Sequence, residues 1–192
     1  MRLRCLKVVL GLAALTALVG CGDEGVSSEE DARRAYLGLD IMVGKAMDLG
    51  FAGFNAASSA NIPPQTTAGK VKGTLNITGQ VDQGSSDNKG MRLKVELIDY
   101  QDDSTIKAVY ATEAALPALD LQLKSIPTGT LSGTLVGTFL MTGDLKGKVT
   151  LNLTMNGQLQ GDKTKVERKP GTTTVTGTAT SDYGTYAVNI TR

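Results

Sequence analysis

The chain is 192 residues long, with 20 Lys and Arg against 19 Asp and Glu, and it contains no His and no Trp. A chain of this length is expected to form one domain whose core is large enough to fold without disulfide or metal cross-links. The absence of His excludes catalysis by Ser-His-Asp or Cys-His groups and excludes His-containing zinc and iron sites. The formal net charge of +1 and the aromatic content of 4% give no reason to expect a nucleic acid as partner.

The start of the chain has the order of a secretory signal peptide. Arg2, Arg4 and Lys7 form a positively charged start, and the apolar run over residues 8–19 is too short to span a bilayer comfortably. The run ends in LVGC at residues 18–21, which resembles the lipobox of bacterial lipoproteins. The alternative interpretation is a buried N-terminal helix that contains an incidental cysteine.

The lipobox resemblance implies that residues 1–20 are removed and that Cys21 is acylated as the first residue of the mature protein. Removal of Cys5 with the signal peptide would then leave no free thiol for catalysis or metal binding. A lipid with more than one acyl chain anchors a protein stably, so the membrane is an expected partner. In the Gram-negative sorting rule, Asp directly after the lipidated Cys retains a lipoprotein at the inner membrane. Gly22 takes that position here, which implies a cell-envelope protein at the outer membrane.

A tether and a helical region are predicted after the lipobox. Residues 21–28 are rich in Gly, Ser and acidic residues, as flexible linkers are. Ser27 and Glu30 have the spacing of a capping box, and apolar residues then recur at three- and four-residue steps. We expect one helix over residues 30–55 within a helical region 29–60. Asn61-Ile62-Pro63-Pro64 is expected to end it.

From residue 68 to residue 192 apolar and polar residues alternate, which predicts an antiparallel β domain. The predicted strands are 70–81, 91–97, 106–112, 119–126, 129–143, 145–160, 172–181 and 185–191. Their lengths predict strong curvature. The expected fold class is therefore α+β, mainly β, with an N-terminal helix packed on a strongly curved antiparallel sheet, a meander or half-barrel, of about eight strands. Residues 29–192 are expected to form one globular unit.

No set of residues in the sequence predicts a catalytic centre, a bound cofactor or a metal site. The weak metal candidates are Asp99, Asp102 and Asp103, because clustered carboxylates suit hard cations such as calcium. They lack the Asp-x-Asp-x-Asp-Gly order of a calcium loop, so we interpret them as a solvated hairpin turn. The basic run 163–169 is also interpreted as a solvated hairpin, with contact to phosphate or an anionic lipid as the alternative.

Two classes of function remain open. The first is a non-enzymatic structural or accessory lipoprotein that binds an envelope protein or contributes to the envelope itself. The second is a carrier for an apolar ligand, with a curved sheet and a helical lid, which resembles the general plan of lipocalins in fold alone. The volume inside the sheet separates them, since helix side chains that fill the concave face would favour the first class.

Overall fold

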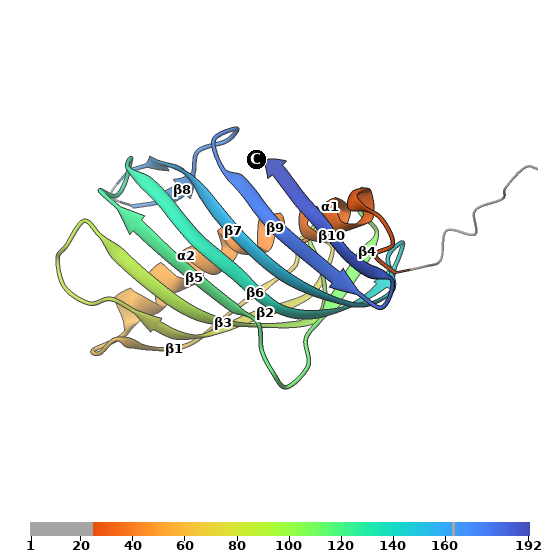
Figure 1. The fold of residues 1–192 in the computed structure, drawn as a ribbon. Coiled ribbons are helices and arrows are strands. Elements are labelled where there is room, and N and C mark those ends of the chain that lie inside the picture. The colour runs from red at the N-terminus through yellow and green to blue at the C-terminus, as the bar shows by residue number, and fades with distance from the viewer. Residues whose placement is uncertain (1–24, 163) are drawn as a thin grey trace, which may run out of the picture.

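The computed structural model describes residues 25–162 and 164–192. Two helices are followed by ten strands (Figure 1): α1 (Glu29–Leu37), α2 (Asp40–Ala56), β1 (Asn61–Ala68), β2 (Lys72–Val81), β3 (Lys89–Gln101), β4 (Ala108–Ala111), β5 (Ala118–Lys124), β6 (Thr130–Gly143), β7 (Gly147–Gly161), β8 (Val166–Arg168), β9 (Thr174–Ser181) and β10 (Gly184–Thr191). The predicted fold class is confirmed, because an N-terminal helical segment packs on a strongly curved antiparallel sheet. The sheet has ten strands rather than about eight.

The helical segment is interrupted at Gly38 and Leu39, where the sequence predicts a continuous helix. A Cβ atom at residue 38 would lie 2.8 Å from Cε2 and 2.9 Å from Cζ of Tyr110, so only glycine lets the chain pass this buried ring. The helix cap also lies one residue later than expected. Ser28 Oγ accepts a hydrogen bond from the backbone N–H of Asp31 at 3.1 Å, and this cap satisfies an otherwise unpaired amide of the first turn.

The sheet is largely a meander, in which strands that follow one another in the chain lie side by side. The order is β1-β2-β3-β4-β6-β7-β9-β10, with β5 pairing with β3 and β6, and β8 pairing with β7. The short strands β4 and β5 therefore lie end to end between β3 and β6. Gly137 lies on β6 beside the start of β5, with a φ of +152° and no room for a Cβ beside Pro117. Glycine at this position permits the close approach of the two backbones.

The segment Asn61-Ile62-Pro63-Pro64, which was expected only to end the helical region, forms the first half of strand β1. This strand pairs antiparallel with β2, and the pairing is irregular between Ile62 and Gln65. Proline has no N–H to donate and is tolerated on an edge strand, which is where β1 lies. The helical region thus ends at Ala56 rather than at residue 60, and the β domain begins at residue 61 rather than at residue 68.

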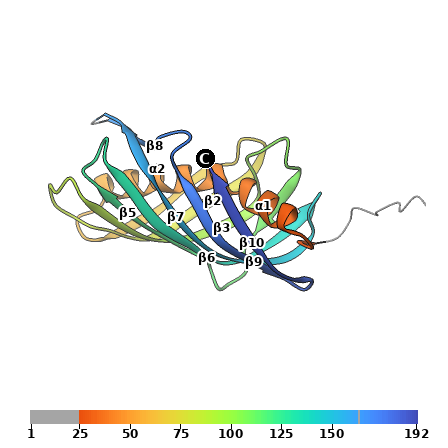
Figure 2. The same cartoon turned by 45° about the horizontal axis from the view of Figure 1, so that its top comes forward.

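The core lies between the helices and the concave face of the sheet (Figure 2). Helix α2 packs on β1, β2 and β3, and helix α1 packs on β10. Large side chains fill this space, and Tyr36, Met42, Leu135 and Phe139 are each 0% exposed. Val26 is also 0% exposed, so this residue belongs to the core rather than to the flexible tether expected over residues 21–28.

Candidate functional site

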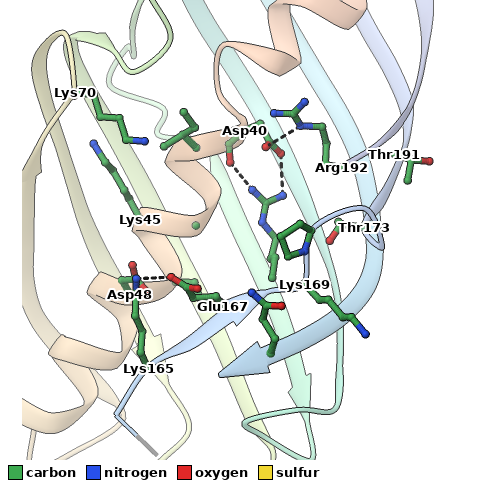
Figure 3. A pocket seen from close by; sticks show the side chains of 16 residues that line it. Asp40, Lys45, Asp48, Lys70, Lys165, Glu167, Lys169, Thr173, Thr191 and Arg192 are labelled. Carbon is green, nitrogen blue, oxygen red and sulfur yellow. Dashed lines mark hydrogen bonds and ion pairs between the residues drawn. The ribbon is translucent and has the colours of Figure 1, made fainter. Parts of the chain in front are cut away.

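A cleft lies at the place where the curved sheet does not close. The edge strands β1 and β10 do not pair with each other, and helix α2 forms the floor between them. The cleft has a volume of about 830 Å³, within the range of small-molecule sites. Its side chains come from α2, from the β1–β2 turn, from β8 and the loop after it, and from the end of β10 (Figure 3).

A buried carboxylate, that of Asp40, holds one wall of this cleft together. Asp40 is 5% exposed. Its Oδ1 accepts hydrogen bonds from the Tyr36 hydroxyl at 2.8 Å and from Arg168 Nη1 at 2.8 Å, and its Oδ2 accepts one from Arg192 Nε at 3.1 Å. Arg168 Nη2 also donates to the Asp40 backbone carbonyl at 2.7 Å. The first residue of α2 is therefore joined to β8 and to the end of β10, which are 128 and 152 residues away.

Burial and the charges of this network shift the pKa of Asp40 and that of Tyr36 in opposite directions. Burial by itself raises the pKa of Asp40, but the hydrogen bond and positive charge of Arg168, with the bonds from Tyr36 and Arg192, outweigh it and lower the pKa. Burial, followed by the negative charge of Asp40, raises the pKa of Tyr36. The carboxylate is thus charged and the phenol neutral at neutral pH, and the lowered pKa makes Asp40 a weak base.

A second buried carboxylate, that of Asp102, fixes the opposite wall. Its side chain is 0% exposed, and its Oδ1 accepts hydrogen bonds from Lys45 Nζ and from the backbone N–H of Lys70, both at 2.7 Å. The Tyr100 hydroxyl donates to its Oδ2. Lys45 Nζ also donates to the Ala68 carbonyl at 2.7 Å. This network clamps α2 to the end of β1 and to β3.

Substitution of Lys45 by Met should destabilise the protein by about 2 kcal/mol, because it keeps the packing of the stem but leaves a buried carboxylate without its ion pair. The expected loss is below that of a fully buried pair since the Lys45 side chain is 20% exposed. Urea unfolding followed by circular dichroism measures the change. Lys94→Met, at an exposed position on β3, should stay within about 0.5 kcal/mol of the wild type. Equal effects of the two substitutions would contradict the proposed clamp.

Basic side chains outnumber acidic ones around the cleft. The basic residues that line it are Lys45, Lys70, Lys165, Arg168, Lys169 and Arg192, and the acidic ones are Asp40, Asp48 and Glu167. Asp102, behind Lys45, is a fourth acidic group. Lys165 pairs with Glu167, whereas Lys70 and Lys169 have no ion-pair partner among the described residues. The cleft therefore keeps an excess of positive charge.

A second cleft, of about 690 Å³, continues the first along α2. The two share Asp48 and Lys165 in their linings. The second cleft is lined by the partly buried side chains of Phe51, Phe54 and Ile126. We call the second cleft the apolar cleft for these three side chains, although Asp87, Lys89 and Asp162 also line it. The two clefts together form the α2 groove, with the basic cleft at one end and the apolar cleft at the other.

The structure separates the three weak metal candidates. Asp102 is buried in its ion pair, Asp103 Oδ1 accepts hydrogen bonds from the backbone and hydroxyl of Thr105 at 2.7 and 2.6 Å, and Asp99 is exposed. The interpretation of all three as a solvated turn is wrong for Asp102. In the part of the chain that the structure describes, no cluster of three or more His, Cys, Asp or Glu could hold a metal ion. Cys21 lies outside the described residues.

Sequence reasoning missed Asp40, Arg168 and Arg192 as a connected group. In the sequence, Asp40 is one of several polar residues of the predicted helix, and Arg168 is one member of the basic run 163–169. The signal that could have singled out Asp40 is its place between Leu39 and Ile41, where a carboxylate needs a partner if the segment is buried.

The fold and groove define an α+β protein in which one curved antiparallel sheet wraps two helices and leaves an open, basic groove at its seam. No protein-family model, curated protein or solved structure matches this chain. Within the described residues, none of the helices combines the length and the apolar character needed to cross a bilayer.

Proposed function

We propose that this protein is a lipid-anchored lipoprotein of the bacterial cell envelope, at the outer membrane, and that it acts by binding rather than by catalysis. The observation that carries the binding role is the filled concave face of the sheet together with the open groove at its seam. A ligand or partner would be received at this surface rather than in an enclosed interior.

The filled core argues against the alternative of an interior carrier for an apolar ligand. The bulkiest fully buried side chains include Tyr36, Tyr110 and Phe139, which occupy the space that such a ligand would need. An apolar cavity large enough for a ligand would cost stability, because its walls lose their packing contacts.

The ion pairs of the buried carboxylates, those of Asp40 and Asp102, support a role without catalysis. Asp40 and Asp102 each hold a cationic partner at 2.7 or 2.8 Å. A general base needs a pKa near the working pH, and Arg168 instead keeps the pKa of Asp40 low. These carboxylates act as structural ion-pair partners.

The position of the first described residues supports attachment at one end of the sheet. Ser181 Oγ donates to the Val26 carbonyl at 2.5 Å, and Gly25 lies beside the Tyr183 ring. Cys21 precedes Gly25 by four residues in the sequence, a span of at most about 14 Å. A lipid on Cys21 would therefore hold the β9–β10 turn close to the membrane surface, and the outward face of the sheet would remain open to an envelope protein partner.

Substitution of Cys21 by Ala should abolish both palmitate labelling and membrane fractionation of the full-length protein, because the acyl chains have no other predicted attachment site. Metabolic labelling in a bacterial host, followed by separation of membrane and soluble fractions, measures both. Cys5→Ala is the matched control and should label as the wild type does. Labelling of the Cys21→Ala protein would show the lipidation assignment to be wrong.

A further inference from the structure

We propose that the α2 groove binds an anionic amphiphile, with the anionic headgroup in the basic cleft and the acyl chain in the apolar cleft. This inference rests on the proposed function only in taking the protein to act by binding. It places the apolar part of the ligand on the surface along α2, outside the core that the helices fill.

The positive charge of the basic cleft favours an anionic headgroup at this end of the groove. Lys70 projects into the cleft from the β1–β2 turn, across from Arg192 at the end of β10, as Figure 3 shows. Arg192 bonds Asp40 through Nε, which leaves its two terminal nitrogens without a hydrogen-bond acceptor in the described residues. A guanidinium fork on one side of the cleft and an ammonium on the other attract a carboxylate or phosphate group.

An unpaired polar atom provides an independent indication of a ligand at this end. Thr173 lines the basic cleft and is 0% exposed, and its Oγ1 is the one buried side-chain nitrogen or oxygen in the described residues that has no hydrogen-bond partner. Its backbone N–H and C=O are both paired with Arg192, at 2.9 and 2.7 Å. Buried hydroxyls are normally hydrogen-bonded. Because Thr173 Oγ1 has no accessible surface, a ligand oxygen next to Arg192 would complete this wall after a small movement of the loop 169–173.

The apolar cleft would bind the acyl chain of the amphiphile. Phe51, Phe54 and Ile126 are only partly buried although they pack against the core, and they line the second cleft together. From Gly44 to Phe54 the helix runs about 15 Å, at 1.5 Å per residue, which suits a medium or long acyl chain. Apolar surface of this kind gains free energy when a ligand covers it.

The junction between the two clefts is compatible with an amphiphile that passes through it. Asp48 is the carboxylate at this point, and burial raises its pKa, against the opposing charge of Lys165. Glu167 lies beside it and is paired with Lys165. A soluble anion alone would leave the apolar cleft uncovered, and an uncharged lipid would leave the basic cleft without a counter-charge.

Photolabelling tests this proposal with the full-length protein in neutral detergent micelles. The probe is a hexadecanoic acid that carries a diazirine near the end of its chain, and the comparison is its methyl ester, which has the same tail without the charge. Cross-linked peptides are mapped by mass spectrometry. We expect the acid to label the segments around Phe54 and Ile126 about fivefold more than the ester does, the factor that one or two exposed ion pairs supply.

Two pairs of substitutions separate the charge of the groove from the charge of the protein. Lys70→Glu with Lys169→Glu should reduce labelling by the acid to the level of the ester. Lys94→Glu with Lys124→Glu changes the net charge equally at exposed positions on β3 and β5 and should leave labelling unchanged. Circular dichroism melting of each variant verifies that it is folded.

Competition identifies the headgroup and shows what would overturn the proposal. Lysophosphatidylglycerol should displace the acid probe, whereas glycerol phosphate, which lacks a tail, should not; displacement by hexadecanoate alone would assign a carboxylate headgroup. Equal labelling by acid and ester, or labelling spread over exposed Val136 on the outer face of the sheet, would exclude the site. These outcomes are independent of palmitate attachment at Cys21, so lipidation and groove binding can fail separately.

Discussion

Replacing Asp40 with Asn should destabilise the protein by about 3 kcal/mol at neutral pH, because it removes the charge that compensates two arginines. Arg168, whose side chain is 14% exposed, would keep its charge without a carboxylate partner, and Arg192 would lose its bond from Nε. Urea denaturation measures the loss. Asp120→Asn, at an exposed position on β5, is the matched control and should change stability by less than about 0.5 kcal/mol.

The same carboxylate should make the wild type sensitive to acid. The pKa of Asp40 is lowered in the folded state below the ordinary value of an Asp carboxyl, so its contribution to stability is complete above the unfolded-state pKa and is lost as the pH falls through the folded-state pKa. Unfolding midpoints measured from pH 7 to pH 3 should fall more steeply for the wild type than for Asp40→Asn below about pH 4. Parallel curves for the two proteins would contradict the role of Asp40.

Replacing Gly38 with Val should destabilise the protein by about 3 kcal/mol, because the new side chain would have to displace a buried ring. A Cβ atom at this position meets Tyr110 at 2.8 and 2.9 Å, and the Tyr110 hydroxyl is itself fixed by a 3.0 Å hydrogen bond to the Ala35 carbonyl. Thermal and urea unfolding measure the loss.

Two further variants test whether the Tyr110 ring is the cause. Gly44→Ala lies in the same helical segment, where a Cβ meets nothing within 4 Å, and it should stabilise the protein by about 0.5 to 1 kcal/mol. Tyr110→Leu should relieve part of the cost of Gly38→Val in a double-mutant cycle. Strictly additive effects of the two changes would rule out direct contact as the reason.

The sequence by itself determined the layers of this fold, because period-two and helical patterns report which face of each element is buried. Alternation along β2, β6 and β7 placed those strands close to their observed bounds, whereas β3 extends beyond the predicted residues 91–97 at both ends. The Pro63-Pro64 pair was not recognised as part of a strand, because the local sequence does not show whether a strand is central or at an edge. Only an edge strand tolerates residues that have no N–H to donate.

Tertiary structure decided the groove. Asp40, Arg168 and Arg192 are separated by up to 152 residues, and their meeting depends on how far the sheet curves before β1 and β10 face each other across α2. The break at Gly38 is likewise set by Tyr110, which arrives from β4. Periodicity shows which face of an element is buried but not which other element covers it. For this reason the sequence shows where the charged side chains lie along the chain but not that they form one site.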